Sequence, residues 1–355
     1  MYALKQCNSS CRHPLPAPVT PSPPPELTAL ERIIELGADR LETRIACNVT
    51  LAGGANYPVH VITLGNPARD VPAVGYFGGV HGLERIGASV VIAFLQSLVM
   101  RLQWDNTLHK QLESVRLVFM PLVNPGGMVL GTRANPNGVD LMRNAPVEAL
   151  DPVPFLVGGQ RMSAGLPWYR GPKGHAMEIE NQAVCEVVSS ELLTRDFSLS
   201  VDCHSGFGAS DRIWFPYAHT RKPIAHLAEM HALKNIFTES NSHHRYIIEP
   251  QSAQYLAHGD LWDHLYRQAS GPRRGVFLPL TLEMGSWLWV KKNPRQLFSR
   301  HGIFNPLIEH REQRVLRQHL SLLDFLSRAA CGHPLWLPVA ENRERHHAQA
   351  LREWY

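Results

Sequence analysis

The stretch AVGYFGGVHGLERIGASVVIAFLQSLVM, residues 73–100, carries the pattern that decides the fold. Its apolar start, 73–78, predicts a buried strand, and a helix of about four turns over 86–100 follows a glycine-rich loop. The same alternation continues outward along the chain. We expect further strands over 44–51, 57–64, 115–123, 197–203 and 275–285, and helices over 27–41, 179–194, 224–239, 260–269 and 306–328. Apolar strands that alternate with helices predict an α/β fold whose sheet is covered on both faces.

The charge balance argues against a chain built mainly to bind nucleic acid. Thirty-five Lys and Arg residues against 31 Asp and Glu residues give a net charge of +4 over 355 residues, without a basic cluster of useful length. A hydrophobic fraction of 44% is ordinary for a globular protein. No stretch approaches the ~18 consecutive apolar residues of a membrane span, and the first residues lack the pattern of a secretory signal. We therefore expect neither nucleic acid nor a membrane as a partner.

The cysteines indicate the compartment. Six in a chain of this length are too sparse for a disulfide scaffold, and they contain no C-x-x-C pair. We read them as reduced thiols, which predicts a cytoplasmic location.

Three segments are expected. Residues 1–25 form a proline-rich, flexible N-terminal arm, because seven prolines fall within 12–25. Residues 26–330 form one catalytic domain, without a clear interdomain linker. Residues 331–355 turn charged and form a peripheral C-terminal extension.

Reactive side chains concentrate in loops at or near the ends of predicted strands, where ligands bind in open α/β sheets. His81 and Glu84 lie in GGVHGLERIG (78–87), and His204 lies in VDCHSGFG (201–208). Chance supplies about two H-x-x-E pairs in a chain of this composition, so the pair means little alone. Its context is informative, because glycines allow a tight turn that points both side chains into one cavity. Two His and one Glu satisfy a catalytic zinc site, which needs three protein ligands and one open position.

The ordered set of motifs resembles the zinc carboxypeptidase family related to carboxypeptidase A, from about residue 55 to 290. The set comprises the H-x-x-E loop, N-P-x-G…R-x-N…G-V-D-L-x-R-N over 124–144, the D-x-H-S strand end and the T-x-E-x-G strand. The resemblance implies a single mixed, mostly parallel, twisted sheet with helices on both faces. It also implies that one Zn²⁺ per chain is held by His81, Glu84 and His204, and that Glu283 is the general base. A zinc site with an open position lowers the pKa of its bound water to about 7, and a carboxylate at a strand end could accept that proton.

The resemblance also assigns substrate contacts. Arg133 is similar to the arginine that stabilises the oxyanion, and Arg143 to the arginine that binds the terminal carboxylate of the substrate. Asp140 is similar to the carboxylate that orients the first zinc histidine. Met142 departs from the family, which usually has Asn there, and methionine donates no hydrogen bond to a carboxylate. Tyr255 is similar to the tyrosine that closes over the substrate.

Three functions follow as hypotheses. The first is a zinc metallocarboxypeptidase that cleaves a peptide or peptide-like amide, with a carboxylate near the scissile bond. The second is an N-acyl-amino-acid deacylase similar to the aspartoacylase and succinylglutamate desuccinylase group, which shares the H-G-x-E loop and the D-L-x-R segment. The third is a non-catalytic binding protein on the same fold. The alignment that places Tyr255 also puts Trp262 near the side-chain pocket.

Overall fold

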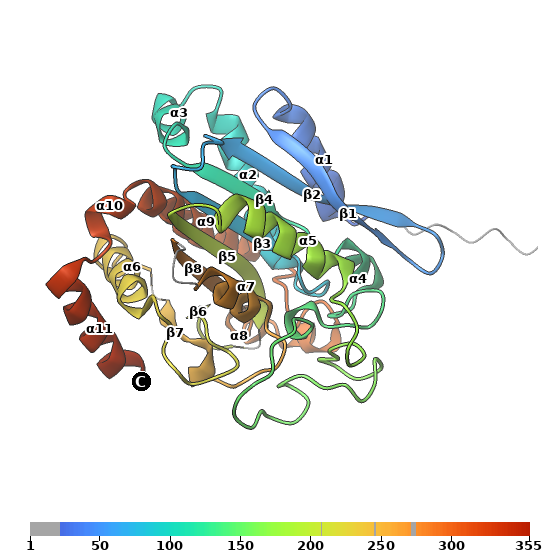
Figure 1. The fold of residues 1–355 in the computed structure, drawn as a ribbon. Coiled ribbons are helices and arrows are strands. Elements are labelled where there is room, and N and C mark those ends of the chain that lie inside the picture. Colours follow the sequence, from blue (N-terminus) through green and yellow to red (C-terminus); the bar gives the residue numbers. More distant parts are fainter. Residues whose placement is uncertain (1–21, 207, 245, 271–274) are drawn as a thin grey trace, which may run out of the picture.

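The computed structural model of the protein describes residues 22–206, 208–244, 246–270 and 275–355. In this part of the chain, eight strands form one sheet in the order β1-β2-β4-β3-β5-β8-β6-β7 (Figure 1). The strands are β1 (Glu42–Thr50), β2 (Asn56–Gly65), β3 (Ala73–Gly78), β4 (Arg116–Met120), β5 (Phe197–Gly206), β6 (Arg212–Phe215), β7 (Ile247–Pro250) and β8 (Val276–Gly285). The pairs β3–β4, β3–β5, β5–β8 and β6–β7 are parallel, whereas β1–β2, β2–β4 and β6–β8 are antiparallel. The expected mixed, mostly parallel sheet is confirmed.

The central strands are apolar on both faces because both faces are covered. Every residue of β3 and β4 is buried, and so is all of β5 except its last residue. The edge strand β1 is mostly exposed over its first half. The continuous apolar runs seen in the sequence are therefore the strands at the centre of the sheet.

Helices lie on both faces of the sheet. The helices are α1 (Pro25–Leu36), α2 (Arg85–Arg101), α3 (Asn106–Leu112), α4 (Pro125–Leu130), α5 (Ile179–Val187), α6 (Leu227–Ser240), α7 (Leu261–Ala269), α8 (Trp287–Val290), α9 (Glu309–Cys331), α10 (His333–Trp336) and α11 (Ala340–Trp354). Short turns of helix are η1 (Leu141–Arg143), η2 (Val188–Leu192), η3 (Gln251–Ala253) and η4 (Pro294–Phe298).

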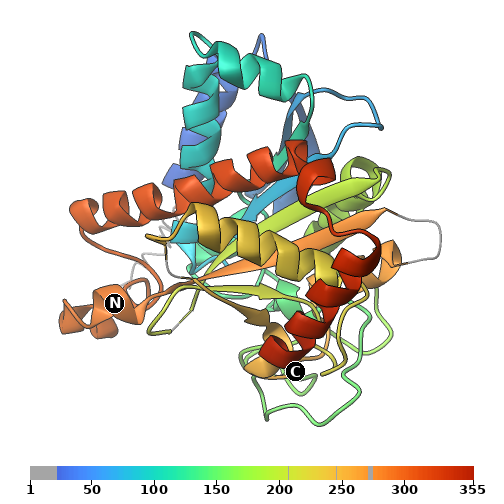
Figure 2. The same cartoon turned by 90° about the vertical axis from the view of Figure 1, so that its left-hand side faces the viewer.

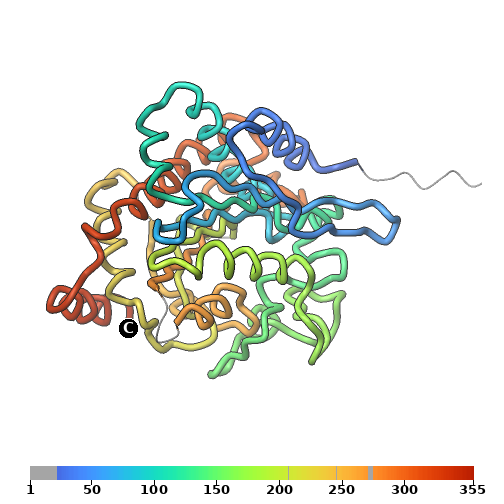
Figure 3. Tube along the Cα trace, turned by 45° about the horizontal axis from the view of Figure 1, so that its top comes forward, coloured from blue at the N-terminus to red at the C-terminus, as the bar shows by residue number. Residues whose placement is uncertain are grey.

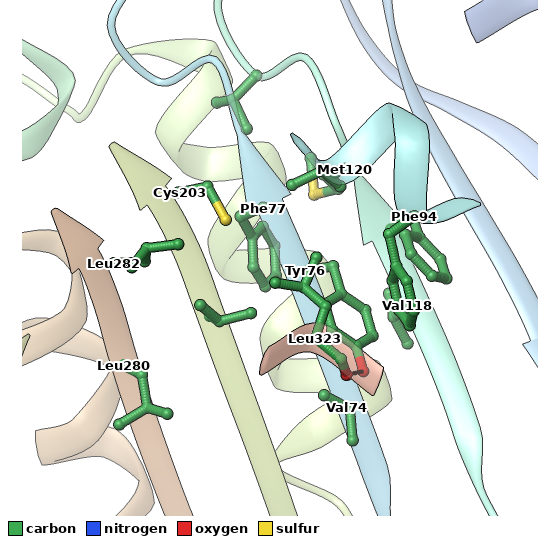
Figure 4. Close-up of a cluster of buried hydrophobic side chains, with 14 of the residues drawn as sticks. Val74, Tyr76, Phe77, Phe94, Val118, Met120, Cys203, Leu280, Leu282 and Leu323 are labelled. Carbon is green, nitrogen blue, oxygen red and sulfur yellow. Dashed lines mark hydrogen bonds between the residues drawn. The ribbon is translucent and has the colours of Figure 1, made fainter. Parts of the chain in front are cut away.

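Two neighbouring residues of β3 show the division between the faces, since successive side chains of a strand point to opposite sides. Tyr76 packs against Phe94 of α2, and its hydroxyl donates a hydrogen bond to the carbonyl of Leu323 in α9 at 2.9 Å (Figure 4). Phe77 meets Trp262 of α7, with ring centroids 5.0 Å apart. The core is thus two apolar layers, one on each side of the sheet.

The face that carries α2 and α9 also carries α6. Figure 2 shows α6 and α9 side by side in front of the sheet, and the rings of Phe237 and Phe325 join them with centroids 5.0 Å apart. Beyond α6 lies α11, at the outer edge of the molecule in Figure 3. Arg343 Nε donates to Glu229 Oε1 at 2.7 Å across that contact.

Several expected boundaries were wrong. The helix expected over 27–41 ends at Leu36, because Gly37 follows and caps it. The helix expected over 179–194 is α5, followed by the single π turn η2. The strand expected over 115–123 is only Arg116–Met120, and the strand at 197 continues to Gly206. The short elements β6, β7 and α8 were not expected.

The N-terminal segment is only partly described, whereas the C-terminal segment is described to Tyr355. Residues 1–21 of the expected N-terminal arm lie outside the described residues, and α1 begins at Pro25. The expected C-terminal extension, 331–355, holds α10 and α11. No single described helix has the length and hydropathy to cross a membrane, and one bent pair, α2 with α3, meets that test by length and composition only.

Candidate metal centre

The three predicted zinc ligands come together at one edge of the sheet. His81 and Glu84 lie in the loop between β3 and α2, and His204 lies near the end of β5. Strands β3, β5 and β8 are parallel neighbours, so their carboxyl ends meet at this edge. One ligand atom from each of the three side chains lies within 4.8 Å of the others.

Two glycines allow the loop to take this position. A Cβ on Gly82 would lie 2.1 Å from the backbone carbon of Gly127, and a Cβ on Gly87 would lie 2.0 Å from the carbonyl oxygen of Cys203. The first contact seats the His81–Glu84 loop on the 124–144 segment. The second fixes the start of α2 against β5, one residue before His204. Backbone approaches this close require glycine.

The donor set fits a metal ion. His81, Glu84 and His204 are all buried, and the two imidazole rings lie 5.0 Å apart, edge to face. Glu84 Oε2 accepts a hydrogen bond from the backbone N–H of Ser205 and lies 3.1 Å from His204 Nδ1. His81 Nδ1 is buried without a hydrogen-bond partner among the described residues. Such an orphaned nitrogen needs an explanation, and a bound cation supplies one.

Charges in the site set the protonation of these groups. Burial, with a contribution from the Arg133 charge, lowers the pKa of His81 to about 4, so its ring is neutral at pH 7 with a lone pair available for a metal. Burial alone would raise the pKa of Glu84, but the two histidines and Arg133 bring it down to about 2. Burial likewise opposes a charge on His204, yet Asp202 and Glu84 raise its pKa well above the usual value.

Asp202 is the first residue of the D-x-H-S motif, but no role was predicted for it from the sequence. It is fully buried, and its Oδ2 lies 2.7 Å from His204 Nε2 in an ion pair. The indole N–H of Trp262 donates to the same oxygen at 2.9 Å. The signal was available, because residues two apart on a strand share a face and Asp202 stands two before His204.

The structure also corrects the expected place of Trp262. Its side chain is only 2% exposed and packs between Phe77 and Asp202, so it lies beneath the site and does not line a side-chain pocket. Cys203, between Asp202 and His204, is buried in the hydrophobic core.

Arg133 joins two buried carboxylates beside the metal ligands. Its Nη1 donates to Glu84 Oε1 and its Nε donates to Asp140 Oδ2, both at 2.9 Å. Asp140 Oδ1 lies 3.8 Å from His81 Nδ1, which is ion-pair range and too long for a hydrogen bond. The role of Asp140 in orienting His81 therefore stays a prediction, whereas its contact with Arg133 is direct.

Glu283 lies beside His204. The two residues are partners in the parallel ladder of β5 and β8, and a Cβ on Gly206 would approach Glu283 Oε2 at 3.0 Å. The carboxylate makes no hydrogen bond to the described residues. Burial raises the pKa of Glu283 to about 7, with the Glu84 charge adding to the rise and His204 opposing it. A carboxylate with such a pKa can both accept and release a proton near neutral pH.

Arg143 and Tyr255 also come together, from segments 112 residues apart. Arg143 Nη2 lies 3.3 Å from the Tyr255 hydroxyl, and the guanidinium carbon lies 5.7 Å from the centre of the tyrosine ring. Arg143 Nε donates to the carbonyl of Val157 at 3.1 Å, which fixes the plane of the fork. Met142 is buried, and its backbone N–H donates to Asp140 Oδ1 at 3.0 Å. Only its backbone therefore takes part in this network.

The chain is similar to known proteins in sequence and in fold. Residues 54–286 match the family model described as zinc carboxypeptidase. Carboxypeptidase SOL1 of Arabidopsis thaliana is 31% identical over 93 residues, which is 25% of this chain and 19% of that protein. Carboxypeptidase D of Anas platyrhynchos is 24% identical over 167 residues, 45% of this chain and 11% of that protein. The chain thus spans only a small part of the length of these curated relatives.

A solved structure shares the fold. The crystal structure of thrombin activatable fibrinolysis inhibitor superimposes with a TM-score of 0.62 at 18% identity, over 85% of this chain and 72% of that one. At this identity the likeness concerns the arrangement of the elements alone.

Proposed function

The chain belongs to the zinc carboxypeptidase family, and from this premise we propose that it is a zinc-dependent metallocarboxypeptidase that hydrolyses a peptide or peptide-like amide bond. The observation that carries the proposal is the buried His81–Glu84–His204 cluster with Glu283 beside it. The match over 54–286 also favours this function over the deacylase hypothesis. An intact ligand set beside an unpaired carboxylate speaks against a protein that only binds.

His81, Glu84 and His204 would hold one Zn²⁺. The ion, when bound, supplies a Lewis acid that lowers the pKa of water and polarises a carbonyl. Two of these ligands have the protonation state that a metal ion requires, since His81 is neutral and Glu84 is ionised at pH 7. The proton on His204 would leave when the ion binds, because metal ligands must be deprotonated.

Glu283 would move the proton. Its carboxylate takes a proton from the attacking water and delivers it to the nitrogen of the departing amine. Arg133 would stabilise negative charge on the carbonyl oxygen of the substrate. Its two hydrogen bonds use Nε and Nη1, and Nη2 makes none to the described residues, so this nitrogen is available as a donor.

Arg143 with Tyr255 would hold the carboxylate end of the substrate. A guanidinium fork pairs well with a carboxylate, and the contact of Arg143 with Tyr255 links the cation to a group that can close over the bound end. Met142 contributes no donor from its side chain. We therefore propose that the substrate carries a carboxylate near the scissile bond and that Arg143 is its main partner.

The test combines zinc analysis with three substrate sets. Purified protein is assayed for bound zinc and then incubated with free-ended peptides, C-terminally amidated peptides and N-acyl amino acids. We expect about one zinc per chain and release of C-terminal residues from free-ended peptides only. Turnover of N-acyl amino acids alone would support a deacylase, and no turnover with full zinc would support a binding protein.

The role of Glu283 is tested by Glu283→Gln, which keeps the shape and removes the base. Zinc content should stay unchanged while turnover falls by about 10²–10⁴-fold, the usual contribution of general acid–base catalysis. Residual activity close to that of the parent would reject Glu283 as the base.

The cytoplasmic location stays a prediction. The described cysteines, Cys47, Cys185, Cys203 and Cys331, are free thiols. Cell fractionation tests the location directly.

A further inference from the structure

A cavity outside the metal centre lies between α8 and the N-terminal half of α9. Its volume is about 650 Å³, within the range of small-molecule sites. It shares no lining residue with the His81–Glu84–His204 cluster. Asp211 is one of its lining residues, and its Oδ1 accepts a hydrogen bond from the backbone N–H of Gly285 at the end of β8.

One part of the wall is apolar and open to solvent. Trp287 and Leu288 on α8 are 37% and 43% exposed, and Val315 of α9 also lines the cavity. An indole and a branched alkyl chain offer a flat and a rounded apolar surface. Side chains of this kind bind the apolar body of a ligand.

Another part of the wall is cationic. Lys291, Lys292, Arg311 and Arg314 all line the cavity. Arg311 Nη1 donates to the carbonyl of Trp289 at 3.2 Å, which ties α9 to α8 and joins the two sides of the cavity. None of these four cations has a carboxylate within ion-pair distance among the described residues. Elsewhere arginines are paired, as Arg85 is with Glu26 and Arg328 with Asp324.

Two titratable groups, Asp211 and His319, also line the cavity, and Asp211 Oδ2 lies 3.9 Å from His319 Nε2. Asp211 is buried, and its oxygens accept hydrogen bonds from Gly285 N and Gln318 Nε2. Burial raises its pKa, which favours the neutral carboxyl. Burial also lowers the pKa of His319 to about 3, so this ring, which bonds to the Tyr246 hydroxyl at 2.8 Å, is neutral.

We propose that this cavity binds a small organic anion with an apolar body, such as an aromatic or aliphatic phosphate or carboxylate. The body lies on Trp287, Leu288 and Val315, and the anionic group pairs with Lys291, Lys292 and Arg314. Neither half of the wall alone accounts for such a ligand, since apolar contact gives no charge selectivity and exposed cations bind simple ions weakly. The proposal does not rest on peptidase activity, because it concerns binding at residues outside the catalytic site.

The test is calorimetric titration of the full chain with 1-naphthyl phosphate, and separately with 1-naphthol and inorganic phosphate. We expect saturable binding of one 1-naphthyl phosphate per chain, at least about tenfold tighter than binding of either fragment. Lys291→Gln combined with Arg314→Gln should weaken binding by about tenfold or more, because charge-assisted hydrogen bonds are lost. These side chains have no partner to lose in the described residues, so circular dichroism should show an unchanged fold.

A matched control is Lys110→Gln, which neutralises an exposed lysine on α3 that does not line the cavity. Its affinity for 1-naphthyl phosphate should equal that of the parent. Leu288→Gln should weaken binding of 1-naphthyl phosphate and leave that of inorganic phosphate unchanged. The proposal is overturned if the parent shows no saturable binding, or if the double variant binds as tightly as Lys110→Gln. The second outcome would place the phosphate elsewhere, including at the metal centre.

Discussion

Replacing Asp202 with Asn should weaken zinc binding by about 10–100-fold, the usual cost of losing a carboxylate behind a metal-bound histidine. The magnitude follows from the geometry, since Asp202 is fully buried and its Oδ2 lies 2.7 Å from His204 Nε2. The loss corresponds to about 1.4–2.8 kcal/mol of binding free energy. Asn keeps a carbonyl oxygen that can accept the Trp262 N–H, so the change removes the charge and preserves the shape.

The assay is zinc affinity by competition with a chromophoric chelator, together with the free energy of unfolding of the metal-depleted protein. The control is Trp262→Phe, which deletes the N–H donor to Asp202 and leaves the carboxylate beside His204. We expect that variant to lose less than about fivefold in zinc affinity, since only a neutral-donor hydrogen bond is removed. Equal zinc affinity for Asp202→Asn and the parent would refute the view that this carboxylate orients His204.

Three further changes follow from the structure. Arg143→Gln should raise KM for free-ended peptides by about tenfold or more in steady-state assays, because the guanidinium that pairs with the terminal carboxylate is lost. An unchanged KM would contradict this role of Arg143. Gly82→Ala should destabilise the protein by about 1–3 kcal/mol in urea unfolding, since the added Cβ would lie 2.1 Å from a backbone atom. An unchanged urea concentration at half-unfolding would mean that the loop can shift without cost. His319, with its pKa lowered by burial to about 3, takes up a proton only after unfolding, so the unfolded state binds more protons as pH falls below about 6.5. The free energy of unfolding should therefore fall by about 2 kcal/mol between pH 7.5 and pH 5 because of this group. His319→Gln should reduce the slope of the unfolding free energy against pH in that range. The same slope in both proteins would contradict this.

The parts of the fold that the sequence predicts well are those with a strong local pattern. The apolar runs of β3, β5 and β8 stand out because these strands are buried on both faces. The strands β6 and β7 are four residues each and half-buried, so their patterns are too short to distinguish from loops. The strand β8 was expected despite Pro279, which β8 tolerates because β6 pairs only with Thr281–Glu283 in the described residues.

Some residues of the site could be predicted from motifs in the sequence, and some of its contacts could not. Motif order predicted that His81, Glu84 and His204 would meet, and the structure brings them together. Asp202 lies in the D-x-H-S motif, two residues before His204, but the motif alone assigned it no role; its hydrogen bond from Trp262 of α7 joins residues 60 apart in the chain. The pairing of Arg133 with Glu84 was equally invisible, since both had been assigned to other partners. Long-range contacts between buried polar groups are set by topology, which motif spacing alone does not encode.

The contact of Gly87 with the carbonyl of Cys203 limits which substitutions the chain can accept at residue 87. It packs together two backbone segments that lie 116 residues apart in the chain, and a single methyl group at residue 87 would push them apart. In a saturation library screened only for soluble expression, codon 87 should accept almost nothing but glycine, though its residue performs no chemistry. Selection for folding alone would therefore preserve the distance between the His81–Glu84 loop and His204, on which the proposed hydrolysis depends.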